Sequence, residues 1–276
     1  MRNRQPNSKS RRAIWLALAA VLVLGAGLVS CGGASKTGEE TESSAPNPIS
    51  GNPIGKPVDP STAGAISGKV TLDGAPPERK PVAMATAPAC ARQYSSPPLA
   101  EDVIAAPSGE LQNVVVYLRG EFSAYAFPLP AVAARMDQKG CMFVPHVVAV
   151  RAGAPLQFLN SDDTSHNIHP VPSRNREWNE SQPRRAAPLD RTFAREEVAI
   201  PIKCNLHHWM SGYIAVLGNP FFQVTGADGS FDIEGIPPGA YTLVAWQEHY
   251  GATEQPITVE ASQKQSVAIV FHATPR

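Results

Sequence analysis

Two short clusters in the second half of the chain hold the side chains best suited to binding a metal ion. One covers residues 160–169 and reads NSDDTSHNIH; the other covers 204–210 and reads CNLHHWM. Together they hold four of the seven histidines. A thiolate, two imidazoles and a thioether suit copper, and a His₂Cys set with a weak axial Met is the arrangement of blue-copper electron-transfer sites. The expected ligands are His166, Cys204, His207 and Met210.

Each cluster offers a second histidine. His208 follows His207 directly, and the offset of three residues after the cysteine favours His207. A ligating imidazole also needs its other nitrogen held by a neighbouring group, so we expect only one of this pair to bind. If a strand follows Ser165, His166 and His169 face opposite sides, and we expect His166 to point at the metal. Zinc fits the same ligands, and metal availability decides between the two ions.

The neighbours of the first ligand have two interpretations. Asn160 and Asn167 carry short amides that suit hydrogen bonds bridging the two ligand loops, and turn formation is an equally good explanation of both. A lone cysteine is also commonly a small buried apolar residue. A Cys followed by His at the third position and Met at the sixth, about forty residues after a His-Asn pair, favours a metal site.

These motifs resemble those of the plastocyanin-like group of cupredoxins. The first ligand loop of that group matches Asn160-x-Asp162 followed by His166-Asn167, and its second matches Cys204-x-x-His207 followed by Met210. The resemblance implies a Greek-key β sandwich that holds one mononuclear type 1 (blue) copper ion. The stretch from the cysteine to the methionine is tighter than in plastocyanin.

A closer resemblance is to exported bacterial proteins in which a plastocyanin-like region precedes a carboxypeptidase-regulatory-like tail. Some of these proteins are labelled as linked to methylamine utilisation. The resemblance covers roughly residues 66–272 and rests on three motifs: Cys141-x-x-x-Pro145-His146-Val147, Asn175-Arg176-Glu177-Trp178-Asn179 and Ile202-Lys203-Cys204-Asn205-Leu206-His207.

The elements that must position these residues are short strands, which predicts an all-β chain. β-Branched and aromatic runs alternate with Gly, Pro, Asn and Asp clusters, as in a β sandwich. The runs lie at 66–72, 114–118, 141–150, 155–159, 198–202, 213–217 and 221–225. The last sixty residues have Asp-Gly and Pro-Pro-Gly turns between alternating apolar positions, and they resemble the smaller carboxypeptidase-regulatory-like (transthyretin-like) β sandwich.

The N-terminal region has the pattern of an exported lipoprotein. Residues 1–30 hold five basic and no acidic side chains, then an apolar run, and Leu28-Val29-Ser30-Cys31 resembles the lipobox at which bacterial lipoproteins are acylated. A transmembrane anchor is the alternative, although the run is at the short limit for crossing a bilayer. Four parts follow: a signal peptide at 1–30, a disordered tether at 31–64, a copper-binding domain at 65–218 and a small β sandwich at 219–276. Alternatively, the first strand, 66–75, is shared with the small sandwich.

The cysteine count predicts a disulfide. Of four cysteines, Cys31 is assigned to lipid and Cys204 to metal. Two free thiols seldom persist in an oxidising exterior, so we expect Cys90 and Cys141 to be joined.

The expected function is transfer of single electrons by a copper protein that is not an enzyme, since four protein ligands leave no open position for a substrate. Beyond residue 30 the chain has 19 basic and 24 acidic side chains, which argues against nucleic-acid binding. The expected partners are a redox protein of the cell envelope and a membrane, reached through the lipid anchor, so the protein is placed at the periplasmic face of a membrane or at the cell surface. Copper binding or delivery without electron transfer, and a structural or interaction module with a vestigial site, are the alternatives.

The mixed-charge segment 172–197 is expected to be a solvated loop, with docking of an acidic partner as its alternative.

Overall fold

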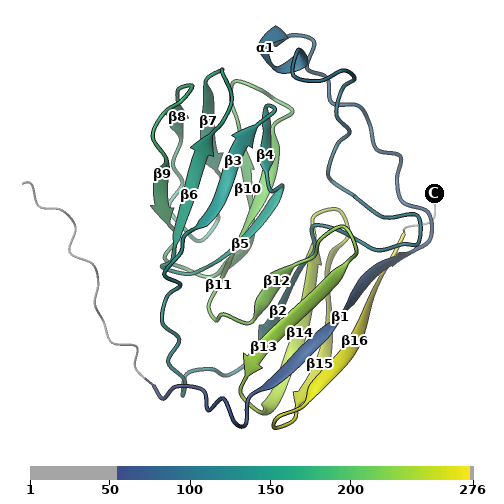
Figure 1. Ribbon diagram of the computed structural model, residues 1–276, viewed down its shortest axis with the longest axis vertical. Helices are drawn as coiled ribbons and strands as arrows, with labels where there is room; N and C mark the ends of the chain where they lie inside the picture. The colour runs from purple at the N-terminus through teal and green to yellow at the C-terminus, as the bar shows by residue number, and fades with distance from the viewer. Residues whose placement is uncertain (1–54, 274–276) are drawn as a thin grey trace, which may run out of the picture. The chain divides into compact units, whose positions relative to one another are not determined.

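The computed structural model describes residues 55–273, which form two β sandwiches (Figure 1). The prediction of an all-β fold with a second, smaller sandwich is confirmed. The signal peptide, Cys31 and residues 31–54 of the predicted tether lie outside the described residues. Within the described range, no helix is long and apolar enough to cross a membrane.

The larger sandwich packs a five-stranded sheet against a four-stranded sheet. The first has the order β5-β11-β10-β7-β8 and comprises β5 (Val147–Arg151), β7 (His166–Pro170), β8 (Glu180–Gln182), β10 (Glu197–Lys203) and β11 (Ser211–Leu217). The second has the order β4-β3-β6-β9 and comprises β3 (Ala134–Lys139), β4 (Met142–Val144), β6 (Pro155–Asn160) and β9 (Leu189–Thr192).

Alternation of buried and less buried positions orients these strands. In β6, Leu156 and Phe158 are buried, and they share the core with Ile200 and Ile202 from the opposite sheet. Because side chains two apart on a strand point to one face, this alternation fixes which face of each strand lies inward. The same alternation continues past the end of β10 to Cys204, which is buried in this core.

The smaller sandwich is assembled from both ends of the described chain. One sheet has the order β13-β1-β16 and comprises β1 (Gly64–Asp73), β13 (Ser230–Ile236) and β16 (Lys264–His272). The other has the order β12-β2-β14-β15 and comprises β2 (Val115–Arg119), β12 (Phe222–Val224), β14 (Gly239–Gln247) and β15 (Gly251–Val259). The structure therefore adopts the shared-first-strand alternative. It also places β2 in the small sandwich, which corrects the range 65–218 expected for the copper-binding domain.

Three local expectations differ from the structure. The run 141–150 is divided into β4 and β5, because Pro145 and His146 turn the chain between them. The segment 172–197 is not a bare loop, since it contributes β8 and β9 to the larger sandwich. The predicted tether ends early, because Lys56 already pairs with Tyr125 in an isolated bridge.

A long irregular segment joins β1 to β2 and carries the described helix, α1 (Pro88–Ala91). Its apolar side chains pack in a small cluster of their own, with Val82, Met84 and Cys90 against Cys141 and Met142. This segment lies against the end of the larger sandwich that carries the two histidine clusters.

Candidate metal centre

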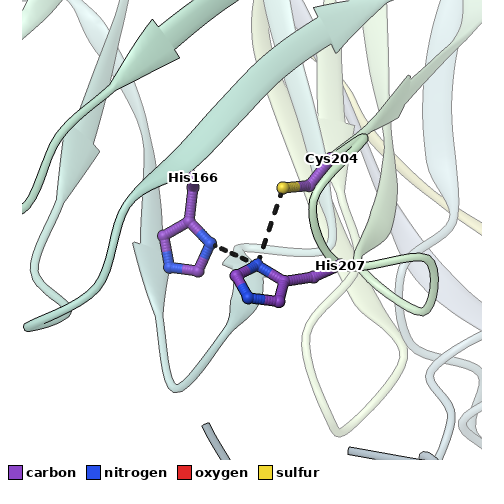
Figure 2. Close-up of side chains that lie close together, drawn as sticks. All are labelled: His166, Cys204 and His207. Atoms are coloured by element: carbon purple, nitrogen blue, oxygen red, sulfur yellow. Dashed lines mark hydrogen bonds between the residues drawn. The ribbon is translucent and has the colours of Figure 1, made fainter. Parts of the chain in front are cut away.

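Three donor atoms meet where the β6–β7 loop and the β10–β11 hairpin loop come together. Nδ1 of His166 lies 3.0 Å from Nδ1 of His207, and Sγ of Cys204 lies 3.7 Å from the same His207 nitrogen (Figure 2). Antiparallel pairing of β7 with β10, through His169 and Lys203, brings the two loops together. The three side chains are almost fully enclosed, with exposed fractions of 0% for His166, 3% for Cys204 and 8% for His207.

This donor set fits a thiolate-binding metal ion. Metal–nitrogen and metal–sulfur bonds of about 2.0–2.3 Å place neighbouring donors about 3–4 Å apart around one ion. The separations of 3.0 Å and 3.7 Å fall in that range without movement of the backbone. Two imidazoles and a thiolate in this arrangement match the equatorial ligands of a copper site.

Asp162 binds the outer nitrogen of the first candidate ligand, His166. Its Oδ2 accepts a hydrogen bond of 2.9 Å from Nε2 of His166, so Nδ1 faces the other donors. Burial raises the pKa of Asp162, but hydrogen bonds from His166 and from two backbone N–H groups outweigh it, and the pKa is lowered. A buried carboxylate on the outer nitrogen of a ligating histidine fixes its tautomer and orientation.

The turn between β3 and β4 supplies the two backbone donors. Gly140 and Cys141 both have positive φ, of 66° and 55°, and their N–H groups each donate to Asp162 at 2.7 Å. Gly140 also lies against Tyr94, where a Cβ would come within 2.2 Å of the hydroxyl oxygen. The turn thus holds the Asp162 carboxylate in place, and that carboxylate in turn orients His166.

The second ligand is covered on its outer edge. Sγ of Cys90 lies 3.6 Å from Nε2 of His207, and the Trp209 ring packs against the imidazole at a centroid distance of 5.2 Å. Burial and the nearby His166 lower the pKa of His207. A lowered pKa favours the neutral imidazole, which is the form that binds a metal.

The thiol of Cys204 is prepared to act as a thiolate. Burial raises its pKa, but hydrogen bonds from His166 and from backbone N–H groups outweigh this effect, and the pKa is lowered. The N–H of Asn167 donates to Sγ at 3.4 Å. Among the described residues Cys204 is the free cysteine.

The two asparagines have different roles. The side-chain oxygen of Asn167 accepts a hydrogen bond of 2.5 Å from the backbone N–H of Asn205, so it joins the two ligand loops. Asn160 instead donates to the carbonyls of Thr164 and Gln182 and accepts from the N–H of Asp162. It braces its own loop and strand β8, which matches the turn-forming alternative.

Met210, His208 and His169, the other candidates from the sequence, lie in different environments. Met210 is fully buried in the same core as Cys204, and its N–H donates to the carbonyl of His207 at 2.9 Å, closing the loop. His208 is exposed. His169 is turned away from the three donors, toward Glu177 at 2.7 Å and the side chain of Asn205 at 3.1 Å.

Cys90 and Cys141 form a disulfide, with their Cα atoms 5.6 Å apart, in agreement with the cysteine count. Cys141, Asp162 and His166 also lie close enough to suggest a second metal group. Because the sulfur of Cys141 is already bonded to Cys90, that group lacks a thiolate. The motif at 160–167 includes Asp162, and its Asp-x-x-x-His spacing is the one sequence signal for the contact with His166. The packing of Trp209 against His207 has no such signal in the sequence.

Comparisons with known proteins give partial similarities. Residues 220–267 match the family described as polysaccharide lyase family 4, domain II, rather than the carboxypeptidase-regulatory-like modules that the sequence resembles. No curated protein sequence matches the chain.

Among solved structures, the chain is similar to a copper-containing nitrite reductase from Thermus scotoductus SA-01, with 17% identity over 36% of this chain and a TM-score of 0.30. It spans only 25% of that protein. It is also similar to a purple cupredoxin from Nitrosopumilus maritimus, with 18% identity over 30% of this chain and 99% of that one, at a TM-score of 0.27. Amicyanin from Paracoccus versutus gives 17% identity over 37% of this chain and 97% of that one, at a TM-score of 0.29.

Proposed function

We propose that this protein binds one copper ion through His166, Cys204 and His207, with Met210 as a weak axial ligand, and carries single electrons. The observation that carries the proposal is the convergence of Nδ1, Sγ and Nδ1 from these three buried side chains. Copper in such a His₂Cys site supplies a one-electron couple whose potential depends on the axial ligand and on the surroundings of the sulfur.

The chain's own contribution is to hold the donors before and after the electron moves. Asp162 fixes His166, while the side chain of Asn167 ties its strand to the loop that carries Cys204. The N–H of Asn167 also donates to the cysteine sulfur, which stabilises its negative charge. A donor set that is already in place needs little rearrangement between the two oxidation states.

Enclosure of the donors favours electron transfer over copper delivery. Delivery requires a ligand that an acceptor protein can reach, whereas His166 has no exposed surface and Cys204 has 3%. An electron needs no opening. The indole of Trp209 packs against His207 and is itself partly exposed, so it connects the centre to the protein surface. Four protein ligands also leave no position for a substrate, so we propose no catalytic activity.

The partner and location belong to the same proposal. A lipid on Cys31 would tether the protein to the cell envelope, where it would exchange electrons with a redox protein. Replacement of Cys31 by Ser removes the acylation site, so the variant should move from the detergent phase to the aqueous phase in a Triton X-114 partition. Equal partition of the variant and the unaltered protein would contradict the anchor.

Voltammetry tests electron transfer itself. The copper-loaded protein should give a reversible one-electron wave, and His208→Ala should preserve it because that side chain is exposed and outside the donor set. His207→Ala should abolish or broaden the wave, since it opens an equatorial position. A tightly bound copper ion without a reversible wave would favour the copper-binding alternative.

A further inference from the structure

A second cluster of ionisable side chains surrounds His146, away from the three donors described above. Nε2 of His146 lies 2.5 Å from Oε1 of Glu248, and Nδ1 lies 3.8 Å from Oε2 of Glu101. The imidazole is 5% exposed, while the two carboxylates are 11% and 28% exposed respectively. The three residues come from distant parts of the sequence: the β4–β5 turn, the end of β14 and the segment between β1 and β2.

The position of His146 is fixed by the backbone. Its carbonyl accepts a hydrogen bond of 2.9 Å from the N–H of Tyr213. The neighbouring Gly212 approaches so closely that a Cβ there would lie 2.6 Å from the same carbonyl oxygen. The backbone of His146 is therefore held in place, and the contact of Nε2 with Glu248 orients the ring, as a preformed binding site requires.

Nδ1 of His146 has no hydrogen-bond partner among residues 55–273, although it is buried. The short contact with Glu248 orients Nε2–H toward that carboxylate, so in the neutral ring the Nδ1 lone pair faces Glu101. A separation of 3.8 Å is too long for a hydrogen bond, whose usual length is about 2.7–3.2 Å. A lone pair and a carboxylate oxygen that face each other in a buried place repel unless a positive charge lies between them.

The surroundings favour a cation. His146 and Glu101 both line a cavity of about 390 Å³. Among the described residues that line it, four are acidic and one is a lysine: Glu78, Glu101, Asp102, Glu248 and Lys80. Burial raises the pKa of Glu101, and the charges of His146 and Arg79 offset this only in part.

We propose that Nδ1 of His146 and a carboxylate oxygen of Glu101 bind a divalent transition-metal ion of the Zn²⁺ or Cu²⁺ type. Bonds of about 2.0–2.2 Å to each donor span the observed gap with little movement. Glu248 then acts as the carboxylate that orients a ligating histidine. The other acidic side chains lining the cavity offer oxygen ligands for the remaining positions.

The competing occupant of the gap is a proton. Burial lowers the pKa of His146, but the hydrogen bond and charge of Glu248, with the charge of Glu101, outweigh it, and the pKa is raised. A proton on Nδ1 would nevertheless be a buried donor with its nearest carboxylate at 3.8 Å. The metal and the proton therefore give different ring-nitrogen spectra.

Long-range ¹H–¹⁵N NMR of the metal-free protein, titrated with Zn²⁺ at neutral pH, separates the two. The Nδ1 resonance of His146 should move to a metal-bound position while Nε2 keeps its proton. Because each histidine is observed separately, Zn²⁺ at His166 or His207 does not affect the reading. Glu248→Gln should weaken binding at His146 about 10–100-fold.

Glu101→Gln keeps the size of the side chain and removes its charge, and it should weaken binding at His146 at least 10-fold. His272→Ala and Glu121→Gln, both at exposed positions, are the controls and should leave the titration unchanged. A His146 ring that stays doubly protonated, or shows no response up to about 1 mM Zn²⁺, would overturn the proposal. Equal affinity in Glu101→Gln and the unaltered protein would also overturn it.

Discussion

Sγ of Cys90 lies 3.6 Å from Nε2 of His207, so a disulfide sulfur covers the outer nitrogen of a proposed copper ligand. The bond to Cys141 anchors this cover to the turn whose N–H groups hold Asp162. The disulfide is therefore linked to both imidazoles. It contacts His207 directly, and it is connected to His166 through Asp162. Its loss should affect both the stability of the chain and the enclosure of the metal centre.

Replacing Cys90 and Cys141 together by Ala should lower the free energy of unfolding by about 2–4 kcal/mol, because the unfolded chain loses its cross-link. The same variant should release copper faster to a chelator, because the edge of His207 is uncovered. Urea unfolding and the rate of copper removal measure the two effects. Arg92→Ala, at an exposed position near Cys90, leaves the bridge intact and is the control. Unchanged release from the double variant would show that the disulfide does not enclose the centre.

Asp162→Asn should weaken copper binding about 10–100-fold, because the amide supports the His166 imidazole less well than a carboxylate. The adjacent Asp163 provides a matched control, since it is exposed and pairs with Arg185 instead of a ligand. Competition with a chelator of known affinity gives both values. Equal losses in the two variants would mean that general charge, not the contact with His166, is responsible.

The sequence predicted the donor set because its spacing is local. The offset from Cys204 to His207 fits within one hairpin loop, and the position of His166 at the start of a strand fixes its direction. The partners of the outer nitrogens were not predictable in this way. Cys90 reaches His207 only through the path of a long irregular segment, and the contact of Asp162 with His166 depends on the exact turn of their loop.

Strand partners showed a similar limit. The run at β2 was expected, but its pairing with β14 joins residues more than a hundred positions apart, and alternation of apolar side chains does not specify a partner. β8 and β9 were missed because they are short and largely polar, with few fully buried positions. The environment of His146, contributed by Glu101 and Glu248, depends on the same long-range packing.

Glu197 should make stability depend on acid pH. Its carboxylate accepts hydrogen bonds from the N–H groups of Ser173, Arg174 and Asn175. Burial raises its pKa, but these bonds and those from the Ser173 and Asn175 side chains outweigh burial and lower the pKa from 4.5 to about 2. A group with a lowered folded-state pKa stabilises the fold above its unfolded pKa, and this contribution disappears as the pH falls through the folded value.

Unfolding free energy measured from pH 7 to pH 2 should therefore decline more steeply below pH about 4.5 in the unaltered protein than in Glu197→Gln. At neutral pH the variant should be less stable by about 1–3 kcal/mol, because three backbone N–H donors lose a charged and buried acceptor. The exposed neighbour Glu196→Gln serves as the reference. Parallel pH curves for Glu197→Gln and the unaltered protein would refute the assigned role.

The visible absorption spectrum after addition of Cu²⁺ tests the copper site most directly. One equivalent should produce an intense thiolate-to-copper band in the unaltered protein and in the exposed-site control His208→Ala. Cys204→Ser should remove that band, because Cys90 and Cys141 are joined and no other free cysteine lies among residues 55–273. A protein that shows no such band, or a Cys204→Ser variant whose spectrum and copper content match the original, would contradict a copper centre at His166, Cys204 and His207.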